Sequence, residues 1–260
     1  MIEAEVRVDG GALSYALAGA GPAIVLLHGW TLDRRLWSPQ IDALAGDFKI
    51  VAPDRRGFGR SSAPPDLARE ADDVARLLDA VDAEQAVIVG MSQAGRVALD
   101  VAARFPQRIR ALVLQGAPFD GARPGPDAEE AIPLDLYAGL VRAGRLSAMK
   151  AHWAQHPLMR TMTPAAGVCA AAMLADYDGR DLIGAPPARR EEAAPDSIAA
   201  PTLVITGLLD TPWRRRAGDA LAAALPDATR REIPAAGHLC NLCAPADYNA
   251  ALRQFLATVG

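Results

Sequence analysis

The fold of this chain is decided by the stretch AVIVGMSQAG, residues 86–95. Its first four residues are apolar, as in a strand that is covered on both faces. Gly90 and Gly95 then allow a sharp turn, with the backbone close to its neighbours, into a sequence that is typical of a helix. Such a strand, turn and helix leave the hydroxyl of Ser92 at the apex of the turn, where it can act as a nucleophile.

The pattern of glycine, any residue, serine, any residue and a small residue occurs twice, in two different contexts. At Ser92 the last position is Ala94, which adds only a methyl group to the usual glycine. The second copy, residues 59–63, follows a loop and leads into Pro64 and Pro65, so it has neither the strand nor the helix. Because the motif requires both elements, we expect Ser92 to be the nucleophile.

Short apolar runs recur on both sides of this stretch and predict a mostly parallel sheet. They occupy residues 23–27, 48–52, 86–89, 111–114 and 202–206, and a further strand is expected around residues 229–233. Runs of Val, Ile and Leu without alternation are typical of parallel strands with helices on both faces. Periodic apolar residues predict helices at 68–81, 93–105 and 246–259. Residues 6–15 alternate in polarity around an Asp-Gly turn, which predicts a β-hairpin at the sheet edge.

One long segment, residues 118–200, interrupts the strand pattern. It is helical in texture, with Pro and Gly clustered at its edges. Strands resume after it, so residues on both sides complete the sheet. We therefore expect an α/β core, residues 1–117 and 201–260, with residues 118–200 inserted as a helical cap and not as an independent domain.

Composition narrows the class of protein. The chain has 260 residues, of which 51% are apolar and 22% charged, as in a folded globular protein. A net charge of −4 without a basic run is unlike proteins that bind nucleic acid or anionic membranes. The sequence has no secretory signal pattern and no apolar run of about 20 residues. We expect a cytoplasmic protein whose partner is a small molecule, and nothing in the sequence indicates its oligomeric state.

A serine hydroxyl needs a general base, and His238 is best placed to supply one. It lies in AAGHL, residues 235–239, after the last predicted strand, and small residues let this loop reach the serine. His28 stands at a strand end and is expected to brace a loop. His152 and His156 are four residues apart, but the glutamate of the zinc motif HExxH is missing and no third ligand is evident.

A carboxylate must hold the imidazole, and it should follow another strand between the serine and the histidine in sequence. Asp210 fits this position, in GLLDTP, residues 207–212. Asp120 follows the preceding strand and stays open as an alternative. On chain order and loop form we favour Asp210.

Two backbone N–H groups must also point to the oxygen on which negative charge develops. One is expected from Gln93, at the N-terminus of the helix that follows the serine. The other is expected from Trp30, directly after the flexible Gly29. This chemistry needs no metal or other cofactor, so we expect none.

Three cysteines, Cys169, Cys240 and Cys243, are few and odd in number. This favours free thiols in a reducing compartment over a disulfide framework. Cys240 and Cys243 are three residues apart, but they do not open a helix after a first strand as redox motifs do. A metal bound there would disable the neighbouring His238 as a base, so we expect free thiols.

In chain order, these motifs resemble the serine hydrolases of the α/β-hydrolase fold over almost the whole chain outside the cap. The matching motifs are His28-Gly29-Trp30, residues 54–61, the turn at Ser92, residues 207–210 and Gly237-His238. The resemblance implies an eight-stranded, mostly parallel sheet flanked by helices, with an inserted helical cap. Residues 236–242 are similar to 3-oxoadipate enol-lactonases and related carboxylesterases, whereas residues 54–62 are similar to cofactor-free haloperoxidases. Haloalkane dehalogenases resemble this fold but have Asp at the position of the serine.

The resemblance and these residues predict a serine hydrolase that cleaves a small carboxylic ester or lactone through an acyl-enzyme. A carbon–carbon bond hydrolase or a cofactor-free perhydrolase would use the same triad, and a ligand receptor on this fold would retain it without turnover. Trp153 and Tyr137 of the cap are candidates to line the substrate pocket, although aromatic residues at helical spacing are also common in plain packing. Trp30 is a further candidate for substrate contact.

Overall fold

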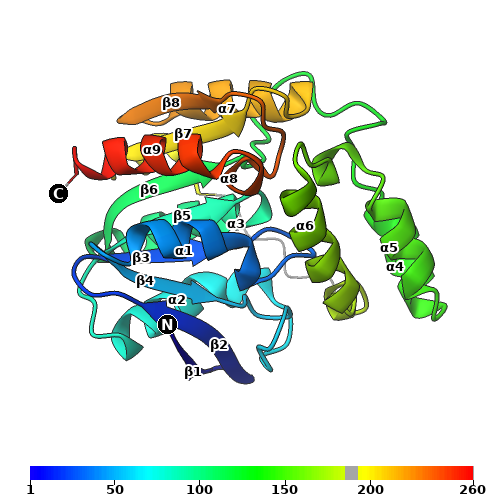
Figure 1. Cartoon of the computed structure of the whole chain (residues 1–260), viewed down its shortest axis with the longest axis horizontal. Coiled ribbons are helices and arrows are strands. Elements are labelled where there is room, and N and C mark those ends of the chain that lie inside the picture. Colours follow the sequence, from blue (N-terminus) through cyan, green and yellow to red (C-terminus); the bar gives the residue numbers. More distant parts are fainter. Residues whose placement is uncertain (185–192, 260) are drawn as a thin grey trace.

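The computed structural model describes residues 1–184 and 193–259. Within them, eight strands form one sheet in the order β1-β2-β4-β3-β5-β6-β7-β8 (Figure 1). β2 pairs antiparallel with β1 and β4, and all pairs from β4 to β8 are parallel. The predicted eight-stranded, mostly parallel sheet is therefore confirmed. The strands are β1 (Ile2–Val8), β2 (Gly11–Ala18), β3 (Ala23–Leu27), β4 (Lys49–Pro53), β5 (Ala86–Met91), β6 (Ile109–Gln115), β7 (Thr202–Gly207) and β8 (Ala228–Ile233).

The strands begin and end close to the apolar runs that predict them, and the first hairpin shows the largest difference. The hairpin lies at the sheet edge, as predicted, with Val8 opposite Gly11 across the turn. However, β1 begins at Ile2, which pairs with Leu17, and not at residue 6. The alternation of apolar and charged residues in fact extends back to Ile2, so the sequence carried a signal for this earlier start that the prediction did not use.

Alternate residues of the central strands point to opposite faces and divide the core in two. Ile24 and Leu26 of β3 belong to the cluster that includes α1 and α9, whereas Val25 and Leu27 belong to the cluster with α2, α3 and α7. Helices therefore flank the sheet on both faces (Figure 1). They are α1 (Ser38–Leu44), α2 (Glu70–Ala80), α3 (Gln93–Arg104), α7 (Pro212–Ala224) and α9 (Pro245–Leu256).

The segment between β6 and β7 carries three further helices in its described residues, namely α4 (Leu134–Arg142), α5 (Leu146–Trp153) and α6 (Pro164–Asp176). Figure 1 shows them together at one side of the sheet. Their buried apolar side chains join the same cluster as α1 and α9, so they pack on the core. That residues 118–200 act as a cap stays a prediction, and its residues 185–192 lie outside the described ones. We refer to residues 118–200 as the cap segment.

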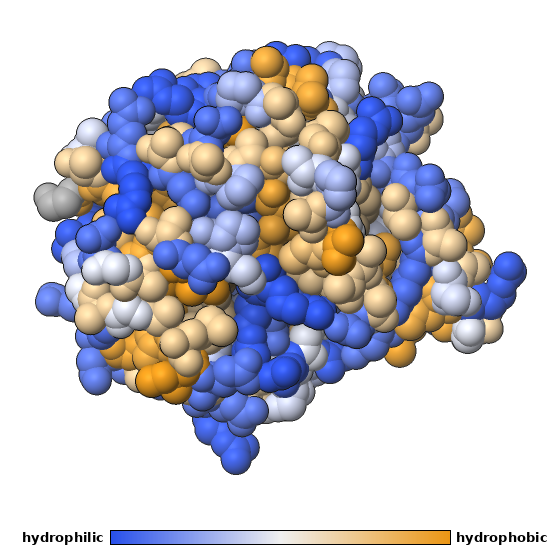
Figure 2. All heavy atoms as spheres, in the orientation of Figure 1, coloured by the Kyte–Doolittle hydropathy of each residue, from blue (hydrophilic) through white to orange (hydrophobic). Residues whose placement is uncertain are grey.

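The surface mixes polar and apolar residues. Figure 2 shows hydrophilic residues between scattered apolar ones on one face of the molecule. Several large apolar side chains are exposed, among them Leu134 and Leu136 of α4 and Leu208 and Leu209 after β7. Over residues 1–184 and 193–259, no helix is both long enough and apolar enough to cross a bilayer.

Candidate active site

Ser92 stands in a tight turn between β5 and α3, as the sequence predicts. Its φ of +54° and ψ of −121° are rare for a residue with a side chain, and such conformations persist where the surroundings hold them. A Cβ at Gly90 would overlap the carbonyl oxygen of Ala94, so the turn requires glycine there. The Ser92 N–H donates to the carbonyl of Gln115 in β6 at 2.7 Å, which fixes the turn against the next strand.

The imidazole of His238 and the carboxylate of Asp210 are in direct contact. His238 Nδ1 lies 2.9 Å from Asp210 Oδ2, and both side chains are buried. The second oxygen, Oδ1, accepts a hydrogen bond from the Thr211 N–H at 2.7 Å. A carboxylate in this place holds the proton on Nδ1 and leaves Nε2 as the acceptor. Nε2 is buried and has no hydrogen-bond partner among the described residues.

Ser92 and His238 line one cleft of about 290 Å³. The other lining side chains are apolar, and they come from the sheet side, from the cap segment and from the loop of His238. They are Trp30, Leu32, Met91, Ile132, Trp153, Leu158, Met159 and Leu239. The His238 imidazole, whose Nε2 lacks a partner among the described residues, and Ser92 therefore share a cleft that is otherwise lined by apolar side chains.

Asp120, the alternative acid, lies elsewhere. Its carboxylate receives a hydrogen bond from Arg96 Nη2 at 2.8 Å, and its side chain is about two-thirds exposed. The structure thus places Asp210, and not Asp120, against the imidazole.

Gly116 makes room for the imidazole and its acid, and the sequence interpretation missed it. Its φ is +54°, and a Cβ there would lie 2.7 Å from His238 Cε1, 2.8 Å from Nδ1 and 3.4 Å from Asp210 Oδ2. Only glycine satisfies both the backbone and the space. A glycine two residues after the predicted strand at 111–114 is the signal that the sequence offers for it.

Arg214 of α7 is a second group that no sequence motif indicated. Its guanidinium is buried, and Nη1 donates to the carbonyl of Gly116 at 3.0 Å. Burial lowers the pKa of Arg214 to about 10, while the nearby Asp210 carboxylate favours the charged form. The residue therefore remains a cation at neutral pH. Its hydrogen bond holds the backbone at Gly116, which lies against the His238 imidazole.

The two expected oxyanion donors flank the serine turn. Gln93 is the first residue of α3, where helix geometry supplies its N–H with no acceptor inside the helix. Trp30 follows Gly29, whose Cβ would lie 2.5 Å from Met91 Sδ and 3.4 Å from Ser92 Cβ. The backbone at Gly29 therefore runs directly against the turn. We call residues 28–31 the 28–31 loop.

His28 and Arg55 brace this loop from the core side. His28 Nε2 accepts from the Arg55 N–H at 2.9 Å, and Arg55 Nη1 donates to the His28 carbonyl at 2.9 Å. Burial, and then the charge of Arg55, lowers the pKa of His28 to about 3, so its ring is neutral. Arg55 also donates to Gln93 Oε1 at 3.1 Å and forms a two-point ion pair with Glu70. One guanidinium thus contacts both the 28–31 loop, at the His28 carbonyl, and the side chain of Gln93.

Of the two predicted pocket residues, Trp153 lines the cleft and Tyr137 lies behind it. The Tyr137 ring is fully buried and stacks on Trp30 with 6.0 Å between ring centres. Its hydroxyl is 2.8 Å from His152 Nδ1. The indole of Trp30 also has a partner, since its Nε1 donates to Asp181 Oδ2 at 2.7 Å.

The remaining predicted residues lie outside the cleft. His156 begins a short 3₁₀ helix, where its Nδ1 accepts from the Leu158 N–H at 3.2 Å. Cys169, Cys240 and Cys243 are free thiols. In the parts of the chain that the structure describes, no group of three or more His, Cys, Asp and Glu side chains is arranged to hold a metal ion.

Comparison with known proteins agrees with the fold. Residues 22–244 match the family described as alpha/beta hydrolase fold. A putative carbamate hydrolase RutD of Variovorax paradoxus is 31% identical over 92% of this chain and 93% of its own length. The solved esterase RhEst1 from Rhodococcus sp. ECU1013 is 25% identical over 100% of both chains, with a TM-score of 0.82. The enol-lactonase from Burkholderia xenovorans LB400 is 25% identical over 98% of this chain and 100% of its own, with a TM-score of 0.79.

Other relatives match over shorter ranges. An epoxide hydrolase of Caballeronia sordidicola is 34% identical over 45% of this chain, and the match spans only 37% of that protein. The family match, in contrast, extends from β3 through the serine turn and the Asp210 turn to the loop of His238 and α8 (Cys240–Cys243). The chain belongs to the α/β-hydrolase fold family.

Proposed function

We propose that the protein is a serine hydrolase that cleaves a small carboxylic ester or lactone through an acyl-enzyme. One observation carries the proposal: the 2.9 Å contact between His238 Nδ1 and Asp210 Oδ2 leaves Nε2 without a partner among the described residues, in the cleft that Ser92 also lines. A base held in this way can accept the proton of a serine hydroxyl that comes within hydrogen-bonding distance, which supports this role for His238 towards Ser92.

Each residue has one task in this reaction. Ser92 Oγ attacks the substrate carbonyl carbon while His238 Nε2 takes its proton, and Asp210 stabilises the imidazolium that forms. The N–H groups of Trp30 and Gln93 donate to the oxyanion of the tetrahedral intermediate. His238 then gives the proton to the leaving alkoxide. A water molecule, deprotonated by the same imidazole, hydrolyses the acyl-enzyme and frees Ser92.

The lining of the cleft favours an uncharged, apolar acyl group. Apart from Ser92 and His238, its lining residues are all apolar. A charged group on the substrate would lose its hydration there without a counter-charge, which is costly. Similarity to an esterase and to an enol-lactonase supports ester and lactone substrates.

A carbamate is the second candidate substrate. It is favoured by the match over nearly the full length of a protein named putative carbamate hydrolase. The same serine would attack a carbamate carbonyl, and His238 would then protonate a leaving nitrogen in place of an oxygen. Relative turnover of matched esters and carbamates with one acyl portion distinguishes the two.

The test combines labelling with turnover. A fluorophosphonate probe should modify the wild-type chain once, at Ser92, as read by peptide mass spectrometry. Ser92→Ala should lose both the label and hydrolysis of p-nitrophenyl butyrate. Ser62→Ala is the control and should keep both, because Ser62 is exposed and lies in the second copy of the pattern, next to the buried serine of that copy, Ser61.

Two outcomes would overturn the proposal. Hydrolysis at the wild-type rate by Ser92→Ala would show that another group is the nucleophile. Labelling of Ser92 without repeated turnover of any ester, lactone or carbamate would instead favour a ligand receptor that retains the triad.

A further inference from the structure

The 28–31 loop is held from the cap segment as well as from the core. We propose that Trp153 and Asp181 are positioning residues that keep the backbone of Trp30 and Thr31 in its catalytic conformation. The proposal rests on the function proposed above, in which the Trp30 N–H binds the oxyanion.

Thr31 has a backbone conformation that threonine rarely adopts. Its φ is +62°, in the left-handed region, and its side chain branches at Cβ. A branched residue is a steric outlier there and keeps this conformation only where its surroundings hold it. Thr31 is also almost fully buried, so nearby side chains can supply the restraint.

One restraint comes from α5. Trp153 Nε1 donates to Thr31 Oγ1 at 2.8 Å, and this hydrogen bond is buried. The ring of Trp153 also meets the ring of Trp30 edge-on, with 4.8 Å between their centres. A single indole therefore contacts both residues of the loop, one by a hydrogen bond and one by packing.

A second restraint comes from the short 3₁₀ helix η5 (Arg180–Leu182). Asp181 Oδ2 accepts from Trp30 Nε1 at 2.7 Å, and Asp181 Oδ1 accepts from the Tyr177 hydroxyl at 2.6 Å. Hydrogen bonds to a carboxylate are stronger than those between neutral groups. Since both oxygens are occupied, Asp181 fixes Trp30 relative to the end of α6.

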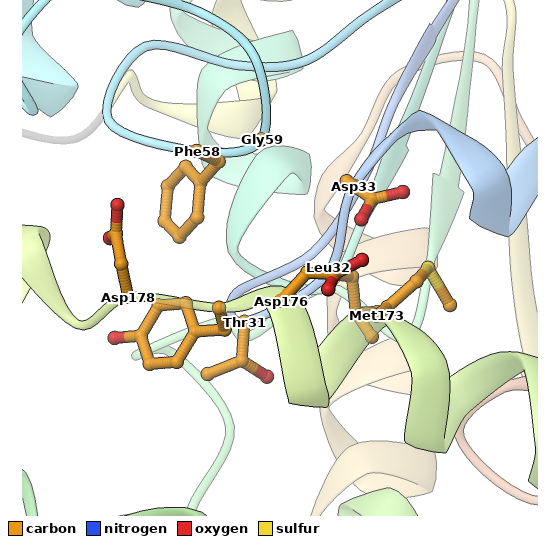
Figure 3. Close-up of a pocket in the computed structure, with 9 residues that line it drawn as sticks. Thr31, Leu32, Asp33, Phe58, Gly59, Met173, Asp176 and Asp178 are labelled. Atoms are coloured by element: carbon orange, nitrogen blue, oxygen red, sulfur yellow. The ribbon is translucent and has the colours of Figure 1, made fainter.

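The space beside the loop explains why these bonds matter. Thr31 and Leu32 border a second cleft of about 290 Å³, whose other walls include Phe58, Met173 and Tyr177. Figure 3 shows Thr31 and Leu32 facing this space near the end of α6. The loop thus borders a cleft on this side, and the hydrogen bonds to Trp153 and Asp181 add to the restraint on its strained backbone.

The restraints link two distant parts of the chain. Trp153 is 122 residues from Thr31, and Asp181 is 151 residues from Trp30. The loop can hold its conformation only when the cap segment is packed on the core. Trp153 therefore does more than line the cleft, and Asp181, which does not line it, still affects catalysis.

The test uses variants that separate the hydrogen bond from the shape of the side chain. Trp153→Phe and Asp181→Asn should each lower kcat for p-nitrophenyl acetate by about tenfold, with KM changed less than about threefold, because part of the oxyanion stabilisation is lost. Trp37→Phe is the matched control. Trp37 is also fully buried, but its Nε1 has no partner in the described part of the chain, so kcat should be unchanged.

Rescue at position 31 distinguishes positioning from plain packing. Thr31→Gly removes the penalty of a positive φ, so the double variant with Trp153→Phe should recover kcat to within about threefold of wild type. Thr31→Val keeps the branched side chain, so its double variant with Trp153→Phe should stay impaired. Thermal unfolding of each variant reports whether it is folded.

Three results would decide against the proposal. Unchanged kcat in both single variants would show that the two hydrogen bonds do not matter. Equal activity of the two double variants would show that strain at Thr31 is irrelevant, and a change confined to KM would show that Trp153 acts only as a cleft wall. Fluorophosphonate labelling of wild-type Ser92 is measured alongside, because its failure would reject the hydrolase itself.

Discussion

Replacing Gly116 with alanine should disable the base without removing any catalytic group. The added Cβ would lie 2.7 Å from His238 Cε1 and 2.8 Å from Nδ1, where about 3.5 Å or more is needed for carbon contacts. The imidazole must therefore move by roughly 1 Å, or the backbone of β6 must yield. A misplacement of about 1 Å can cost on the order of a hundredfold in rate.

We therefore expect Gly116→Ala to lower kcat for p-nitrophenyl butyrate by about a hundredfold, or about 2.7 kcal/mol in the activation barrier. The positive φ of this residue adds a stability cost of roughly 1 kcal/mol, which thermal unfolding would report. Fluorophosphonate labelling of Ser92 should slow in parallel with kcat, because both reactions need the same general base.

Gly144 supplies the matched control. Its φ is +70°, so alanine is strained there too, but a Cβ at Gly144 would have no atom within 4 Å. Gly144→Ala should therefore lose stability and keep kcat. If Gly116→Ala kept kcat within about threefold of wild type, or if both variants lost activity to the same extent, the imidazole would not be held as the structure indicates.

Three other expectations concern buried groups. Asp210→Asn should lower kcat by about 10⁴, because it removes the carboxylate that contacts His238. Asp120→Asn breaks only an exposed ion pair with Arg96 and should change kcat less than about threefold. The reverse order in steady-state assays would assign the role of the acid to Asp120. Burial lowers the pKa of His28 from 6.5 to about 3, so the neutral ring stabilises the fold fully above pH 6.5 and loses this effect as the pH falls towards 3. Urea unfolding of His28→Gln should show a weaker loss of stability over that range, and an unchanged slope would contradict the assignment. Burial also raises the pKa of the Cys240 and Cys243 thiols. Iodoacetamide at pH 8 should therefore alkylate them much more slowly in the native protein than in urea, as read by intact mass. Equal rates would argue against buried thiols.

The strands and the serine turn could be predicted because their signals are local. The run at 86–89 is uninterrupted and is followed at once by the small residues that a tight turn needs, so one window of sequence contains the whole unit. The bounds of helix α7, in contrast, could not be predicted. Its buried side includes Arg214 and Gly218 as well as apolar residues, so the periodicity of apolar residues does not show where the helix begins and ends.

The parts of the site that escaped prediction depend on contacts between distant residues. The need for glycine at position 116 arises from the His238 ring, 122 residues later in the chain. Trp30 was a candidate for substrate contact, and the fold gives its indole N–H a carboxylate partner in Asp181. Sequence could name these residue types, but only the packed structure shows which atoms they meet.

The order of the strands has a consequence for how the protein acquires activity as it folds. Trp30, Ser92, Gly116, Asp210 and His238 follow β3, β5, β6, β7 and β8, which are five neighbouring strands of the sheet. The strands pair in parallel, and parallel pairing between segments far apart in sequence is slow. Because His238 follows the last strand, a nascent chain can display the serine turn long before the base arrives. Recovery of the proposed esterase activity after dilution from urea should therefore report the final pairing of β8 with β7, later than any signal from the hairpin β1-β2.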